Sequence, residues 1–265
     1  MKKTILNVLM IVCILVAVGC GGYLGYYYYT SYQTENEFDD LRNLVSDKKT
    51  TKRTDQTDSA EEFVDVDGVF IQKKFEQLYK KNKDFIGWIT IDDTHIDYPV
   101  MYSPSDQEGG EYYIHRDYDG KYSSAGLPFI DANCSVNPAT DNIIIYGHNM
   151  KNGSMFGHLK KFVESDETYK KSKYFWILTP EKSYRYEIIS AYTTGVNSDT
   201  YTLFKGPGEE FEQYLQKIKG YSEIQTEENE LTIKDKIVTL STCTGNESTR
   251  FVVQGKRVNS VDVTQ

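Results

Sequence analysis

The stretch FIGWITIDDTHIDYPV, residues 85–100, shows the pattern on which the fold prediction depends. Two apolar runs, 85–91 and 95–100, flank the polar triplet Asp92-Asp93-Thr94. Runs rich in Ile, Val, Trp and Tyr on either side of a turn-forming triplet are typical of consecutive β-strands. This stretch therefore predicts two short strands joined by a turn.

Similar runs recur along the rest of the chain. Further strands are expected at 128–130, 142–146, 174–178, 184–192, 236–242 and 250–258. Helices are expected at 71–79, 155–163 and 209–219, where apolar residues recur at helical spacing. About seven or eight short strands with three helices predict a mainly antiparallel β domain, with a barrel as its expected form.

The N-terminal region predicts a membrane anchor. No charged residue occurs between Lys3 and Glu35, and the apolar segment 5–25 is long enough to span a bilayer as a helix. Lysines precede this segment and acidic residues follow it, so the positive-inside rule predicts a cytoplasmic N-terminus and an extracellular remainder. The length of the segment and the tyrosines at its end argue against a cleaved signal peptide. The run Ala17-Val18-Gly19-Cys20 is a weak match to a lipoprotein box, because Ala17 stands where such boxes usually carry Leu.

Composition divides the chain into three segments. We expect a cytoplasmic tip and transmembrane anchor at 1–33, a polar flexible stalk at 34–65 and an extracellular domain at 66–265. The net charge of -9 gives no electrostatic footprint for nucleic acid. The 4 cysteines form no C-x-x-C pair, and two of them lie in the apolar segment, which argues against a disulfide framework and a zinc ribbon.

A candidate nucleophile ends the run Thr239-Leu240-Ser241-Thr242-Cys243. Side chains alternate along a strand, so the odd-numbered positions are expected on one polar face while Val238 and Leu240 point into the core. A thiol displayed on a polar face at a strand end is available for chemistry, although a lone cysteine is more often a small buried residue. Cys134 has no role that we can assign.

A nucleophilic cysteine needs a nearby base or positive charge, because an unperturbed thiol is mostly protonated at neutral pH. His148 directly follows the apolar strand 142–146 and is therefore expected at the rim of the domain, whereas the other three histidines are expected to have no role. Arg250 opens the strand after the polar loop 244–249. If the two strands form a hairpin, the guanidinium returns beside the Cys243 thiol, where it can hold a carbonyl or an oxyanion.

Other catalytic motifs are missing from the sequence. There is no H-E-x-x-H, no G-x-x-x-x-G-K and no G-x-S-x-G, and nothing implies a metal or an organic cofactor.

Taken together, these motifs make the chain resemble the class B sortases of the Gram-positive cell envelope. The resemblance rests on the N-terminal anchor, the runs 84–89, 96–100, 144–150 and 239–243, and the strand that begins at Arg250. It implies a closed eight-stranded β-barrel of the sortase type with an N-terminal helix and additional peripheral helices, preceded by the transmembrane helix. The helix at 209–219 also fits class B.

The resemblance also implies a membrane-anchored cysteine transpeptidase. Cys243 would attack a carbonyl in the C-terminal sorting motif of a secreted surface protein and form a thioester. His148 would serve as acid and then base, Arg250 would hold the carbonyl or oxyanion, and Ser241 would line the peptide groove. The acceptor would be an amine of peptidoglycan or its lipid-linked precursor.

The sequence leaves several alternatives open. The loop between Cys243 and Arg250 is shorter than in many class B members, so an Asn-Pro-Gln-Thr-Asn-like and a Pro-x-Thr-Gly-like motif are both possible. A pilin-polymerising sortase, with a lysine of another subunit as acceptor, is the nearest alternative. An L,D-transpeptidase is disfavoured because no His adjoins the run Ser241-Thr242-Cys243-Thr244. A noncatalytic surface-binding module is the third alternative.

Overall fold

The computed structural model describes residues 2–45, 62–103, 109–137, 139–227 and 230–262. The chain divides into two compact units, Met1–Asn43 and Leu44–Gln265. Helix α1 (Lys2–Val45) accounts for the first unit and, among the described residues, is the one helix long and apolar enough to cross a membrane. It continues into the region where a flexible stalk is predicted. Residues 46–61, the rest of that stalk except its last four positions, lie outside the described residues.

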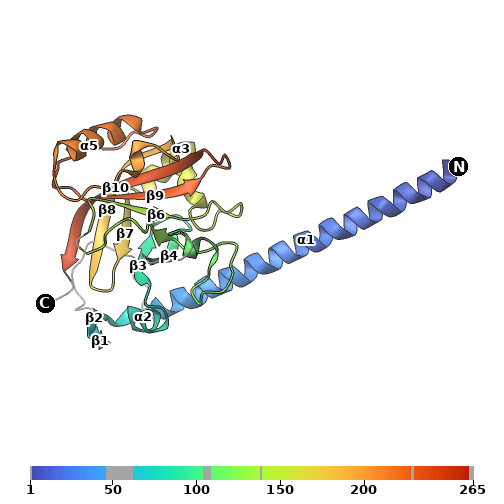
Figure 1. Ribbon diagram of the computed structural model, residues 1–265, viewed down its shortest axis with the longest axis horizontal. Coiled ribbons are helices and arrows are strands. Elements are labelled where there is room, and N and C mark those ends of the chain that lie inside the picture. Colours follow the sequence, from blue (N-terminus) through green and yellow to red (C-terminus); the bar gives the residue numbers. More distant parts are fainter. Residues whose placement is uncertain (1, 46–61, 104–108, 138, 228–229, 263–265) are drawn as a thin grey trace. The chain divides into compact units, whose positions relative to one another are not determined.

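The second unit is built on a closed barrel of eight strands (Figure 1). The strands are β3 (Phe85–Thr90), β4 (Asp97–Met101), β5 (Phe129–Ile130), β6 (Asn142–Tyr146), β7 (Tyr174–Leu178), β8 (Lys182–Gly195), β9 (Ile237–Cys243) and β10 (Thr249–Asp262). Their order around the barrel is β10-β8-β7-β3-β4-β5-β6-β9, and the pairing of β9 with β10 closes it. The predicted eight-stranded barrel is confirmed. Most pairs are antiparallel, but β4–β5 and β6–β9 are parallel.

A glycine lets the long strand β10 bend over the barrel. Gly255 lies at a register shift in the pairing of β10 with β8. A Cβ atom at this position would lie 2.3 Å from the ring of Phe175, so no other residue fits without displacing that buried ring.

Helix α5 (Glu209–Tyr221) covers one outer face of the barrel. Its apolar stripe is the one predicted from the sequence, and its four members Phe211, Tyr214, Leu215 and Ile218 are all buried. They pack in one cluster with Ile189 of β8 and Ile237 of β9. Each fully buried side chain of this size contributes roughly 1.5–3 kcal/mol of transfer free energy.

The entry to the domain differs from the sequence prediction. Strands β1 (Phe63–Val66) and β2 (Val69–Gln72) form a hairpin whose turn, Asp67-Gly68, has positive φ at both positions. Such a turn matches the twist of paired strands and therefore favours a hairpin. Ile71, predicted within a helix, is thus a buried strand residue. The helical part is limited to the 3-10 turn η1 (Lys73–Phe75) and α2 (Glu76–Lys81).

Short helical turns connect the remaining strands. They are η2 (Tyr112–His115), η3 (Gly157–Lys160), α3 (Lys161–Glu164), α4 (Asp166–Lys171) and η4 (Asp199–Tyr201). The helix predicted at 155–163 is therefore divided and starts later, because Met155 has a positive φ of 53° and forms an isolated bridge with Asn149.

Candidate functional site

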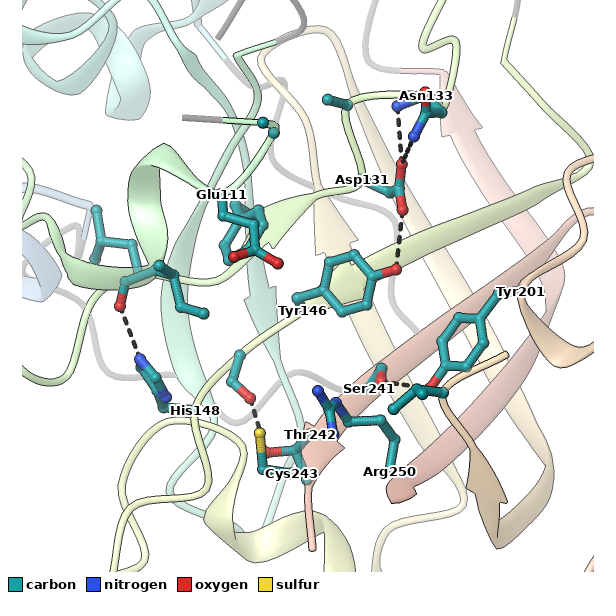
Figure 2. A pocket seen from close by; sticks show the side chains of 18 residues that line it. Glu111, Asp131, Asn133, Tyr146, His148, Tyr201, Ser241, Thr242, Cys243 and Arg250 are labelled. Carbon is teal, nitrogen blue, oxygen red and sulfur yellow. Dashed lines mark hydrogen bonds between the residues drawn. The ribbon is translucent and has the colours of Figure 1, made fainter. Parts of the chain in front are cut away.

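An open pocket of about 230 Å³ lies where β6 and β9 end (Figure 2). The four residues predicted for the site, Cys243, His148, Arg250 and Ser241, all line it. Figure 2 shows His148 and Arg250 on opposite sides of Cys243. The structure thus gathers residues that lie as far apart as 148 and 250 in the sequence.

The parallel pairing of β6 and β9 brings His148 to the same edge as Cys243. Tyr146, the last residue of β6, pairs with Ser241; two residues further along lie His148, just past β6, and Cys243, the end of β9. Two hydrogen bonds connect the two chain segments beyond that pair. The Gly147 amide donates to the Ser241 carbonyl at 3.1 Å, and the Asn149 side-chain amide donates to the Cys243 carbonyl at 2.8 Å.

The polar face predicted for β9 exists, but it is covered. Thr239 and Ser241 are 0% and 1% exposed, whereas Cys243 is exposed. Thr239 donates to Asn142 and accepts from Gln254, and Gln254 also donates to the Tyr214 hydroxyl of α5. These partners satisfy the buried polar groups, and of the odd-numbered positions only Cys243, the last, is exposed at the pocket. Among the described residues, no hydrogen bond involves the Cys243 thiol.

His148 is held by a backbone carbonyl. Its Nε2 lies 2.8 Å from the Ile114 carbonyl oxygen of η2. A carbonyl can only accept, so Nε2 carries the hydrogen and Nδ1 is the atom that gains or loses a proton. Burial lowers the pKa of His148, the neighbouring His115 lowers it further, and the hydrogen bond to Ile114 partly opposes these effects. The imidazole is therefore neutral at neutral pH.

Arg250 pairs directly with Cys243 across the β9–β10 hairpin, as the sequence predicts. Its NH1 donates to the carbonyl oxygens of Glu247 and Thr249 at 3.0 and 2.9 Å. These two bonds fix the direction of the guanidinium. Within the described residues its other nitrogens have no hydrogen-bond partner, so they are available to a bound carbonyl or oxyanion.

Two tyrosines in the pocket were not predicted. The hydroxyls of Tyr201 and Ser241 lie 2.9 Å apart, and the Tyr201 ring stacks on Tyr146 with 6.3 Å between centroids. Tyr146 donates to Asp131 at 2.9 Å, and Asp131 is also part of the pocket wall. Burial raises the pKa of both tyrosines. With 22 tyrosines in the chain, nothing in the sequence distinguishes these two.

The other histidines and Cys134 lie outside the pocket lining. His115 stacks on His148 with 5.2 Å between ring centroids, so it contacts the site although no role was expected for it. His95 and His158 form a separate pair with 4.2 Å between centroids. Cys134 is buried, and burial raises its pKa to about 11. In the described part of the chain, no three His, Cys, Asp or Glu side chains converge as metal ligands.

Comparison with known proteins agrees with this architecture. The sortase domain family matches residues 89–258. A sortase B of Listeria monocytogenes is 38% identical over 200 residues, which cover 71% of this chain and 75% of the relative. A sortase B of Staphylococcus aureus is 30% identical over 187 residues, which cover 69% and 73%.

Solved structures agree with the sequence relatives. The crystal structure of sortase B from B. anthracis in complex with AAEK1 has a TM-score of 0.71 and 29% identity, and the match covers 88% of this chain and 99% of that one. The Staphylococcus aureus sortase B–substrate complex has a TM-score of 0.64 and 29% identity, with 71% and 86% covered. The chain therefore belongs to the sortase family and is a cysteine transpeptidase of its class B.

Proposed function

We propose that this sortase cleaves a C-terminal sorting motif of secreted surface proteins and transfers the acyl group to an amine of peptidoglycan or its precursor. The observation that carries the proposal is an exposed Cys243 thiol between a neutral imidazole and a fixed guanidinium in one pocket. The related Staphylococcus aureus sortase B has been solved as a complex with substrate, which supports a bound substrate in the corresponding pocket of this chain.

The first half-reaction forms a thioester. The Cys243 sulfur attacks the carbonyl of the motif, while the free donors of Arg250 stabilise the negative oxygen. As the sulfur attacks, the thiol proton passes to neutral His148. The C–N bond then breaks, and His148 gives that proton to the leaving amine. No hydrogen bond joins His148 to Cys243 among the described residues, so each group acts on the substrate that lies between them.

The second half-reaction transfers the acyl group. An amine attacks the thioester carbonyl, the C–S bond breaks, and neutral His148 accepts a proton from the amine. Ser241, Tyr201 and Tyr146 form the wall of the pocket beyond Cys243 and support a groove for the peptide.

The location of the enzyme is also part of the proposal. The apolar part of α1 would anchor it in the cell membrane in a single pass, with a cytoplasmic N-terminus and the barrel outside the cell. The polar stalk predicted at 34–65 and the catalytic domain predicted at 66–265 fit this arrangement.

The test uses the full chain in detergent with a library of quenched sorting-motif peptides. Mass spectrometry follows the adduct on Cys243 before and after an amine is added. We expect a thioester that becomes an amide, and the reactive peptide identifies the motif. A lysine-containing pilin peptide and a wall-peptide amine are compared as acceptors. A folded protein with a free thiol that gives no adduct across the library would overturn the proposal.

A further inference from the structure

One of the two carboxylates in the pocket wall has no bound partner. Asp131 is occupied: its Oδ1 accepts from the Asn133 backbone and side chain, and its Oδ2 accepts from the Tyr146 hydroxyl. The exposed side chain of Glu111 makes no hydrogen bond or ion pair with any other described residue. A cation that enters the pocket therefore finds one carboxylate that it can bind without breaking existing hydrogen bonds.

Glu111 lies one 3-10 turn from the residue that holds His148. It precedes η2, and its carbonyl accepts from the Ile114 amide at 2.9 Å. The Ile114 carbonyl is in turn the partner of His148 Nε2. Glu111 and His148 both line the pocket, so a group bound by Glu111 shares this pocket with the imidazole that must accept its proton (Figure 2).

The charges in the pocket are divided between its two sides. Arg250 lies beside Cys243 on the side away from His148, and Glu111, the residue before η2, lies in another part of the wall, away from Arg250 (Figure 2). The peptide carbonyl needs a positive partner, which Arg250 supplies. The acceptor is a primary amine, which is mostly protonated at neutral pH because its ordinary pKa is roughly 8–10. An ammonium group needs a negative partner.

We propose that Glu111 binds the acceptor of the second half-reaction in its ammonium form and presents it to His148. The proposal rests on the transpeptidase function proposed above. The ammonium gives one proton to neutral His148, and the resulting amine attacks the thioester carbonyl. The C–S bond then breaks, and the second proton passes from the new amide nitrogen to the departing Cys243 thiolate. The substrate class is therefore a primary amine that is cationic before it reacts.

The test compares cationic and neutral nucleophiles. The cationic probe is triglycinamide at pH 7, which has one primary amine and no carboxylate, and the neutral probe is hydroxylamine. For Glu111→Gln in the full chain we expect the KM for triglycinamide to rise about two- to fivefold, the size of an exposed ion pair. The KM for hydroxylamine should not rise in this variant. Glu111→Asp keeps the charge and should restore part of the affinity.

Glu164→Gln is the matched control, since it removes an exposed carboxylate on α3 outside the pocket lining. Added salt should raise the KM for triglycinamide in the parent enzyme and in the control, but much less in Glu111→Gln. Equal KM values for Glu111→Gln and Glu164→Gln, or an equal effect on both nucleophiles, would overturn the role of Glu111.

A binding measurement separates this inference from the transpeptidase proposal. NMR titration of triglycinamide into the Cys243→Ala chain, with and without Glu111→Gln, requires no turnover. Weaker binding in the double variant supports the ammonium site, and unchanged binding refutes it. A failure to form the Cys243 adduct refutes the transpeptidase proposal, whatever the titration shows.

Discussion

Cys243 and His148 each lie two residues beyond the last pair of the parallel strands β9 and β6, Ser241–Tyr146, with Cys243 at the end of β9 and His148 just past the end of β6. Parallel strands run in the same direction, so residues that follow a pair at equal distance emerge at the same edge of the sheet. The register of β6 with β9 therefore brings the thiol and the imidazole to one edge of the barrel. The hydrogen bond from the Gly147 amide to the Ser241 carbonyl holds the chain past the end of β6 at that edge.

The first prediction concerns the thiol. Cys243→Ala should abolish adduct formation while the free energy of unfolding changes by less than about 0.5 kcal/mol, because the side chain is exposed. Urea denaturation and mass spectrometry of the same preparation check both parts. Cys134→Ala is the control. It should leave adduct formation on Cys243 intact but lower the free energy of unfolding, because it truncates a buried side chain. Residual adduct on the Cys243→Ala chain would show that another residue is the nucleophile.

The second prediction concerns the protonation of His148. Burial and His115 both lower its pKa, so an NMR titration of its ring protons should give a midpoint below the ordinary value of 6.5. His115→Ala removes a neighbouring positive charge at low pH and exposes the ring, so it should move the midpoint upward. A midpoint that does not move, or that moves downward, would show that His115 does not contribute.

The third prediction concerns Gly147, between the strand β6 and His148. A Cβ atom here would lie 2.7 Å from the ring of Phe156, which is fully buried. Gly147→Ala should therefore destabilise the domain by about 1–3 kcal/mol and lower activity by displacing His148. Phe156→Leu in the same chain makes room and should recover part of the activity. If Gly147→Ala alone were neutral in both assays, the close packing would not control the position of His148.

Much of this site follows from the sequence, and the reasons for the exceptions are physical. Strand alternation and hairpin closure predict the exposure of Cys243 and its pairing with Arg250, because both depend on local periodicity. Thr239 is buried because Gln254 donates to it and also to Tyr214 of α5. This contact joins segments far apart in the chain, so the apolar periodicity of the sequence cannot predict it. Tyr201 is likewise brought to Ser241 by tertiary structure.

Structure that apolar periodicity does not capture also explains why the helices predicted at 71–79 and 155–163 are wrong at their first residues. Ile71 fits helical spacing, but the turn Asp67-Gly68 selects a hairpin. Met155 fits helical spacing as well, but its positive φ excludes it from the helix. In both cases backbone geometry at one or two residues overrides the apolar pattern.

The fourth prediction concerns the hydrogen bond between Tyr201 and Ser241. Ser241 is 1% exposed, and the Tyr201 hydroxyl is its only side-chain partner among the described residues. Tyr201→Phe leaves a buried hydroxyl without a partner and should cost about 1–3 kcal/mol of stability. Ser241→Ala added to Tyr201→Phe removes that unpaired hydroxyl, so the double variant should be no less stable than Tyr201→Phe. A double-mutant cycle by urea denaturation measures the coupling, and additive effects would mean that the two hydroxyls do not interact.

The fifth prediction concerns acid stability and the His95–His158 pair. Burial and the neighbouring His95 lower the pKa of His158 to about 4, while an unfolded histidine titrates near 6.5. Between these values the unfolded chain binds a proton that the folded chain does not, so stability must fall as pH decreases from about 6.5 to about 4. His158 is partly exposed, so we expect a loss on the order of 1 kcal/mol after screening by solvent. In the parent chain the His95 backbone amide donates a hydrogen bond to His158 Nδ1 at 3.0 Å. His158→Gln removes the titrating ring but keeps an acceptor for this amide. Urea denaturation at pH 6.5 and 4.5 should show a smaller loss for this variant than for the parent chain. An equal loss in both would assign the acid sensitivity to other groups.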